Sequence, residues 1–325
     1  MRVLVTGGTG FVGRNLVHLL HEAGHEVTLL HRPTSRLHDL PDGIRKVQGD
    51  VTDADSIAGV CEGIDWVFHV AGEVSWGRFV RRAMSDSHVK GTQNMVNEAK
   101  RAGVRRFIQT SSAAAVGLPD SEEPVDETYP FDGEQLDVGY AIAKRTAEEI
   151  VLRAVDDGLP AVVVNPTVIF GIRTYTPNFV AAVAKGRLTI APDGGVNLCD
   201  VRDVARGHLL AAEKGRIGER YILGGTNLPF VEAFRRIARL GGSDKPIRVL
   251  KRTAAIPIAL VSEALSWISG REPMLAWDLA KLAGRRIYYS SQKAVRELGY
   301  TITPFDEAMQ ETVDWLMGNT KVDVD

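Results

Sequence analysis

Hydrophobic residues in the first part of the chain alternate between short apolar runs and helical spacing. The runs predict strands at 2–6, 26–31, 44–48, 65–70, 105–110 and 161–165. Apolar positions three and four apart predict helices at 11–23, 53–62, 76–102, 138–157 and 200–214. This alternation is typical of right-handed βαβ units, which form a parallel sheet with helices on both faces.

A glycine-rich segment joins the first predicted strand to the first predicted helix. It reads TGGTGFVG at 6–13, so Gly7, Gly10 and Gly13 satisfy G-x-x-G-x-x-G, and starting from Gly8 it also satisfies G-x-G-x-x-G. Glycine allows a sharp turn and close approach of the backbone to a pyrophosphate, and the following helix directs free N–H groups at that anion. This position, between a strand and a helix, predicts a dinucleotide site; a glycine turn without a ligand is the alternative.

The pattern becomes looser after residue 170. It predicts short strands at 187–190, 195–198 and 219–223, and helices near 229–240, 253–269, 274–284, 290–298 and 304–317. We therefore predict an α/β protein: a Rossmann-type doubly wound parallel sheet with a smaller mixed α/β substrate-binding region. The dinucleotide-binding domain spans 1–170, with 200–225 packing back on it, and the smaller region comprises 171–199 and 226–325.

Composition narrows the classes of partner. The 325 residues are 44% hydrophobic and 25% charged with a net charge of −2, which gives no broad attraction to nucleic acid or acidic lipid. We therefore expect a small-molecule substrate, no nucleic acid and no membrane partner. Cys61 and Cys199 lie far apart without a metal-ligand spacing, which predicts no metal and a reduced, cytoplasmic setting. Met1 leads directly into a strand, so no signal peptide is expected.

One apolar stretch, Ala254 to Ser269, is too short to be a membrane span and is interrupted by Pro257 and Glu263. It reads as a buried helix, with a lid over an apolar substrate, a dimer contact or a membrane-surface contact as alternatives.

Tyr140 and Lys144 are spaced to share one face of a helix. A free tyrosine has a pKa near ~10, and lowering it to roughly 7 takes about 4 kcal/mol, which a neighbouring ammonium can supply. Such a tyrosine can exchange a proton with a carbonyl or hydroxyl oxygen. A predicted strand ends at Thr110, Ser111 and Ser112, and its end should lie near Tyr140. A serine hydroxyl there can bind a substrate oxygen. A surface Tyr–Lys pair and a strand-end cap are the alternatives.

These pieces resemble the extended short-chain dehydrogenases/reductases, which include NAD(P)-dependent sugar epimerases, dihydroflavonol-reductase-like enzymes and 3β-hydroxysteroid dehydrogenases. The matching segments are TGGTGFVG at 6–13, GDVTD at 49–53, DWVFHVAG at 65–72, VKGT at 89–92, TSS at 110–112, YAIAK at 140–144, NPTVIFG at 165–171 and DVRDVARGHLLA at 200–211. LGG at 223–225, SGREP at 269–273 and SSQKAVRELGY at 290–300 favour the dihydroflavonol-reductase-like and hopanoid-associated sugar epimerase-like branch.

The resemblance implies a role for each matching residue. Ser112 polarises the substrate oxygen, Tyr140 is the general acid/base, and Lys144 holds the nicotinamide ribose and lowers the pKa of Tyr140. The implied coenzyme contacts are Gly7, Gly10, Phe11, Val12, Gly13, Asp50, Val51, Ala71, Gly72, Thr110, Pro166, Thr167 and Val168, besides Tyr140 and Lys144. His88 stands where the family usually has asparagine, and it either replaces that residue or only packs on a helix.

The end of the second predicted strand carries no acid for a ribose 2′-hydroxyl. Arg32 and Arg36 follow it, and arginine binds a 2′-phosphate that a carboxylate would repel. We therefore predict NADP, with NAD as the alternative.

Reductase and epimerase remain open as reactions, because both use the same three catalytic residues. Ser112 is followed by two alanines rather than Asp-Glu, which disfavours a dehydratase. An epimerase needs arginines for a second pyrophosphate (Arg173, Arg187, Arg202 and Arg271 are candidates), whereas apolar side chains suit a hydrophobic substrate (Val74, Trp76, Phe79, Phe170, Tyr175, Phe179, Ile190 and Trp277). We favour an NADP-dependent reductase over an epimerase with retained NAD, and over a non-catalytic NADP-binding sensor. The resemblance also implies a homodimer through helices 76–102 and 138–157.

Overall fold

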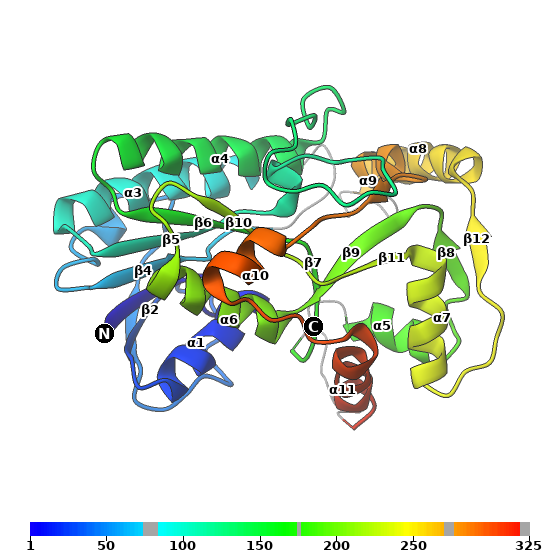
Figure 1. The fold of residues 1–325 in the computed structure, drawn as a ribbon, viewed down its shortest axis with the longest axis horizontal. Helices are drawn as coiled ribbons and strands as arrows, with labels where there is room; N and C mark the ends of the chain where they lie inside the picture. Colours follow the sequence, from blue (N-terminus) through cyan, green and yellow to red (C-terminus); the bar gives the residue numbers. More distant parts are fainter. Residues whose placement is uncertain (74–83, 174–176, 270–275, 319–325) are drawn as a thin grey trace.

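The protein, analysed as a computed structural model, is described for residues 1–73, 84–173, 177–269 and 276–318 (Figure 1). Seven parallel strands form the main sheet in the order β10-β6-β5-β4-β1-β2-β3. Their bounds are β1 Arg2–Thr6, β2 Glu26–His31, β3 Arg45–Gln48, β4 Trp66–His69, β5 Arg106–Thr110, β6 Ala161–Pro166 and β10 Arg220–Leu223. The predicted Rossmann-type α/β fold is therefore confirmed.

Helices cover both faces of this sheet because its strands are apolar on both sides (Figure 1). Val3 and Val5 of β1 belong to the core beneath α1 (Phe11–Glu22) and α6 (Val201–Lys214). Leu4, between them, belongs to the opposite core beneath α3 (Gly91–Ala102) and α4 (Gly139–Asp156). Alternate side chains of one strand thus fill two separate cores.

Two helix predictions need correction. The predicted helix at 53–62 is only a 3₁₀ turn at Asp55–Ile57, since Gly59 and Gly63 follow with positive φ angles of 80° and 71°. Of the predicted helix 76–102, residues 76–83 lie outside the described part. The remainder contains a π-helical turn at Asp86–Lys90 before α3.

The smaller region has its own sheets and core. The first sheet comprises β7 Val168–Phe170, β9 Gly195–Asp200, β11 Thr226–Pro229 and β13 Arg286–Ile287, and the second comprises β8 Ile190–Pro192 and β12 Arg248–Leu250. Its helices are α5 Pro177–Ala184, α7 Phe230–Leu240, α8 Arg252–Ser269, α9 Trp277–Leu282 and α11 Phe305–Gly318. Phe170, Phe234 and Phe305 lie in its apolar core. The sequence did not predict β7, β11, β12, β13 or α5.

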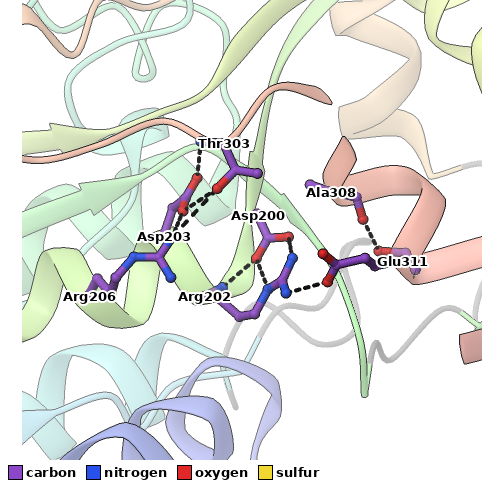
Figure 2. A network of polar contacts seen from close by, with 8 residues as sticks. Asp200, Arg202, Asp203, Arg206, Thr303, Ala308 and Glu311 are labelled. Carbon is purple, nitrogen blue, oxygen red and sulfur yellow. Dashed lines mark hydrogen bonds and ion pairs between the residues drawn. The ribbon is translucent and has the colours of Figure 1, made fainter. Parts of the chain in front are cut away.

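The segment DVRDVAR at 200–206 joins the two parts of the molecule. Figure 2 shows Asp200, which accepts hydrogen bonds from the backbone and guanidinium of Arg202, while Arg202 also pairs with Glu311 of α11. Asp203, next on the same helix, accepts from the backbone N and hydroxyl of Thr303 at 2.7 and 2.8 Å. This segment therefore holds α11 and the residues before it against α6, and the carboxylates of Asp200 and Asp203 in these contacts are buried.

The short helix α10 (Gln292–Leu298) also lies against the main sheet. Ala294, Leu298 and Tyr300 belong to the same core as Val3 and Val5. The sequence analysis assigned residues 226–325 to the smaller region. Within that range, the structure places α10 against the dinucleotide-binding domain.

Candidate active site

The glycine turn after β1 is shaped by close backbone approach. Gly7 has φ +69°, and a Cβ there would lie 2.6 Å from the amide N of Ala71. A Cβ on Gly13 would lie 2.2 Å from the carbonyl O of Gly7, so neither position tolerates a larger residue. Gly10 caps α1 in an extended conformation with no side-chain cap, and the first turn of α1 contains no acid. The first N–H groups of α1 therefore face a cradle that fits the diphosphate of a dinucleotide.

Tyr140 and Ser112 meet at the carboxyl edge of the sheet. Tyr140 lies half-buried in the first turn of α4, and Ser112 directly follows β5 and the neighbouring Ser111. The Ser112 side chain lies close enough to Tyr140 to affect its pKa, and it accepts from the amide N of Ala114 at 3.2 Å. Ser111 is buried instead, and its hydroxyl has no partner among the described residues. Of the two serines, Ser112 is thus the one placed beside the phenol.

The pKa values of this pair differ from the sequence-based expectation. Burial raises the pKa of Tyr140 above its ordinary value of 10.0, and the nearby Ser112 side chain opposes that rise. The predicted lowering of the Tyr140 pKa by Lys144 is therefore not found. Burial lowers the pKa of Lys144 to about 8, partly offset by Glu148, and its ammonium donates to the carbonyl O of Thr110 at 3.1 Å.

Two residues that the sequence analysis did not single out, Glu148 and Asn165, hold the residues of the site in place. Glu148 is fully buried one turn beyond Lys144 and accepts hydrogen bonds from Asn165 Nδ2 at 2.8 Å and Arg220 Nη1 at 3.1 Å. Asn165 Nδ2 also donates to the backbone O of Ser112 at 3.0 Å. The sequence contained a signal for Glu148, because Tyr140, Lys144 and Glu148 are spaced four residues apart and so share one helix face.

His88, which stands in place of the family's usual asparagine, lies in the π-helical turn and contacts Tyr140. The two rings are edge-to-face with centroids 6.1 Å apart. Its Nε2 donates to the carbonyl O of Glu73 at 2.8 Å, so Nδ1 carries no proton in the neutral ring. Burial and the charge of Lys144 lower the pKa of His88 to about 3. A neutral imidazole therefore packs beside the phenol, and a Cβ on Gly72 would lie 2.4 Å from it.

The predicted adenosine contacts lie after β2, β3 and β4. Asp50 Oδ1 accepts from the backbone and hydroxyl of Thr52 at 2.9 and 2.8 Å. Burial raises the pKa of Asp50, but Thr52 and the nearby charge of Arg32 outweigh it, so the net shift is downwards. Arg32 and Arg36 are both exposed. Two cationic side chains therefore stand at the end of β2, and Arg32 is close enough to affect Asp50.

The predicted nicotinamide contacts lie between β6 and β7 and at the end of β5. Pro166 ends β6, Thr167 donates to Asn197 Oδ1 at 2.8 Å, and Val168 is 52% exposed at the start of β7. The Thr110 hydroxyl donates to His208 Nε2 at 2.8 Å, because Nδ1 of His208 donates to a backbone carbonyl.

The remaining predicted contacts also belong to this edge. Phe11 and Val12 open α1, Val51 follows β3, and Ala71 and Gly72 follow β4. The sheet thus brings the predicted residues from six strands to one edge, as open parallel sheets do. In the described part of the chain, no three His, Cys, Asp or Glu side chains could together hold a metal ion.

Known proteins share this architecture and sequence. A family model described as the NAD dependent epimerase/dehydratase family matches residues 3–224. A Synechocystis protein provisionally named dihydroflavonol 4-reductase is 35% identical over 326 residues, covering 97% of this chain and 94% of that protein. Sterol demethylase protein B of Methylococcus capsulatus is 31% identical, covering 97% and 98%. The crystal structure of gox2253 is similar with a TM-score of 0.86 and 36% identity, covering 98% of this chain and 99% of that one.

Proposed function

We propose a specific reaction for this chain, which belongs to the NAD dependent epimerase/dehydratase family and is an NAD(P)-dependent dehydrogenase, reductase or epimerase. The family resemblance predicted from the motifs is thus confirmed. The reaction is hydride transfer between NADP(H) and the carbonyl or hydroxyl carbon of a small hydrophobic substrate, with Tyr140 as acid/base. The observation that carries the proposal is the position of Tyr140 beside the Ser112 side chain, one helical turn from the buried Lys144.

The side chains at this edge suit protonation of a carbonyl oxygen. Because the pKa of Tyr140 is raised, its phenol holds a proton at neutral pH and is a donor in the reductive direction. The Ser112 hydroxyl beside it can donate a second hydrogen bond to the same oxygen. Lys144, with a pKa of about 8, is mainly an ammonium at pH 7, and it would hold the nicotinamide ribose of a bound coenzyme. The coenzyme, when bound, supplies the hydride.

Arginines at the end of β2 support NADP over NAD. Arg32 and Arg36 are exposed there, and no carboxylate occupies the end of β2. A guanidinium binds a 2′-phosphate through paired charge-assisted hydrogen bonds. Asp50 is no substitute for the usual acid, since its Oδ1 is engaged by Thr52.

Arginine pairing supports a reductase over a nucleotide-sugar epimerase. Arg202 is held by Asp200 and Glu311 (Figure 2), and Arg173 Nε donates to Asp39 Oδ2 at 2.6 Å. Two of the four candidate ligands for a second pyrophosphate are thus already paired with carboxylates. Arg187 is exposed, and Arg271 lies outside the described residues.

The apolar residues predicted to line a substrate pocket are distributed unevenly. Phe170 is buried in the core of the smaller region, whereas Phe179 and Ile190 are 45% and 50% exposed, and Trp277 begins α9. Val74, Trp76, Phe79 and Tyr175 lie outside the described residues. Phe179 and Ile190 therefore remain available to contact an apolar substrate, whereas Phe170 is better explained as core.

For assembly and location we propose what the sequence led us to expect. We propose a cytoplasmic homodimer through the outer faces of the 76–102 and 138–157 helices. Support comes from α3 and α4, which pack side by side on one face of the sheet. Size-exclusion chromatography with light scattering tests the dimer, and substitutions on α4 test the face.

Turnover with and without the phenol tests the proposed reaction. The protein, purified without dialysis, should contain no retained NAD(H) by mass spectrometry and should oxidise NADPH with aromatic or aliphatic carbonyl compounds. Tyr140→Phe should lower kcat by about 10²- to 10⁴-fold, because it removes the proton donor and little else. NADPH should still raise the thermal stability of the variant, since a ligand of the folded state stabilises it.

Two outcomes would contradict this function. Retained NAD(H) with interconversion of nucleotide sugars would make the protein an epimerase. Unchanged turnover in Tyr140→Phe would remove the acid/base assignment, and binding of NADPH without turnover of any carbonyl compound would favour a sensor.

A further inference from the structure

Helix α8 has an inverted distribution of side chains. Its buried positions include Ala259, Ser262 and Ser266. Its exposed positions include Leu260, Val261 and Leu265, which are 54%, 61% and 60% exposed. A helix of a water-soluble domain normally buries its large aliphatic side chains and exposes its small and polar ones. The helix therefore presents to its surroundings the side chains that a protein core would usually enclose.

Basic residues stand in β12, just before α8 and at its first position. Arg248, Lys251 and Arg252 are exposed, and none of them forms an ion pair with another described residue. The only acid between residues 248 and 266 is Glu263, which is half-buried and accepts from the backbone N of Trp277 at 3.0 Å. The surface around the start of α8 therefore combines exposed aliphatic side chains with three exposed cations, and Asp193, which lies near Arg252, forms no ion pair with it among the described residues.

We propose that α8 rests on the surface of an anionic lipid bilayer. Its aliphatic side chains would enter the headgroup region, while Arg248, Lys251 and Arg252 contact lipid phosphates. None of the described helices is long and apolar enough to cross a membrane, so the contact is interfacial. A second copy of the chain fits less well, because it would bring a second set of three cations into the same contact.

The proposed contact of α8 with a bilayer differs from the expectation, made from the sequence, of no membrane partner. That expectation rested on the net charge of −2, which averages over the whole chain. Electrostatic attraction to a charged surface falls off within about 8–10 Å at physiological salt, so a local cluster of cations matters more than the total.

The helix is connected to the candidate active site through α9 (Figure 1). α8 packs against α9, and Lys281 of α9 donates to the carbonyl O and carboxylate of Asp137 at 2.6 and 3.1 Å. Asp137 lies three residues before Tyr140. If the proposed reductase function holds, its apolar substrate could then reach the site from the bilayer. The membrane contact itself does not depend on that function.

Vesicle sedimentation tests the contact. The protein should co-sediment with vesicles of phosphatidylcholine and phosphatidylglycerol, much less with phosphatidylcholine alone, and less as salt rises. The triple variant Leu260→Ser, Val261→Ser and Leu265→Ser should lower the affinity by about ten-fold or more, because it removes the apolar insertion. Ile217→Ser is the matched control, since Ile217 is 53% exposed in the turn between α6 and β10. It should bind as the wild type does.

Charge and self-association are tested separately. Arg248→Ser, Lys251→Ser and Arg252→Ser together should abolish the preference for the anionic vesicles. Failure of the wild type to bind, or equal binding by the aliphatic variant, overturns the proposal. So does a change from dimer to monomer in that variant by light scattering without vesicle binding, which would make α8 a protein interface. Turnover of a water-soluble carbonyl compound should be unchanged in all these variants, whereas failure of the reductase function would appear in the wild type as well.

Discussion

Helices α4 and α8 are both eighteen residues long but distribute their side chains in opposite ways. α4 buries Lys144 and Glu148 against the sheet, and each buried charge has hydrogen-bond partners there. Among the side chains of α8 that the structure describes, Ala259, Ser262 and Ser266 are buried, whereas Leu260, Val261 and Leu265 are exposed. Burial of a charge costs free energy that its hydrogen-bond partners must offset. An aliphatic side chain that stays exposed does not contribute the stabilisation of the fold that its burial would give. Helix α4 therefore departs from the usual burial of apolar residues at the candidate active site, whereas α8 departs from it at the protein surface.

The largest effect on stability is expected at Glu148. Glu148→Ala should lower the free energy of unfolding by about 3 kcal/mol, since it leaves Arg220 and Asn165 without their buried acceptor. Glu149→Ala on the same helix is the control. Its carboxylate is 43% exposed, so that change should cost under about 0.5 kcal/mol. Urea unfolding measures both, and equal losses would contradict the contrast between the two helices.

Acid should weaken the dinucleotide-binding side first. Burial lowers the pKa of His69, His88 and His208 to about 3, 3 and 4, below the ordinary 6.5. The unfolded chain therefore binds more protons as the pH falls below 6.5, and stability should decrease by about 1–2 kcal/mol per histidine at pH 5. All eight histidines precede residue 209, so residues 226–325 contribute no such term.

Unfolding at pH 7 and pH 5 checks this dependence. His208→Gln should lose less stability between the two pH values than the wild type does. His38→Gln, at an exposed position, should behave as the wild type. An identical loss in all three proteins would show that other groups control the acid response.

Coenzyme preference should change by a smaller amount at an exposed position. Arg32→Glu should shift the ratio of NADPH to NADH affinity by about ten- to a hundred-fold towards NADH, because it replaces a phosphate ligand by an anion. Arg45→Glu, at the first residue of β3 and so at the amino edge of the sheet, should leave the ratio unchanged. Thermal shifts with each coenzyme give the ratio, and no change in Arg32→Glu would move the 2′-phosphate contact elsewhere.

The smallest effect is expected on α8. Val261→Ser should change the free energy of unfolding by less than about 0.5 kcal/mol, since the side chain is already exposed. The same substitution at Val151, which is fully buried on α4, should cost several times more. A large loss at Val261 would mean that another part of the protein covers the helix in solution.

The sequence predicted the main sheet well because most of its strands are apolar runs; β3, which reads RKVQ and is largely exposed, is an exception. Each strand of that sheet lies within a residue or two of its predicted bounds. Strands β7 and β13 of the smaller region have three and two residues, and β13 pairs with a segment more than ninety positions earlier. A run of two or three residues is too short to show the period of a strand, and its partner is not visible in local sequence.

The same limit applies to the site. Tyr140, Lys144 and the glycines could be found because their spacing follows one helix or one turn. Glu148 supports Ser112 through Asn165, and that contact joins residues 148, 165 and 112, which only the folded sheet brings together. The pKa of Tyr140 also depends on burial, which no spacing records.

The position of α10 has a consequence for synthesis of the chain on the ribosome. The core that contains β1 is completed by Ala294, Leu298 and Tyr300, more than 280 residues after β1 itself. The nascent dinucleotide-binding half therefore emerges with an incomplete apolar layer, and it must wait for the last tenth of the polypeptide before that layer closes. Removal of residues 290–325 should yield a chain that aggregates rather than a smaller stable domain, even though every strand of its main sheet is present.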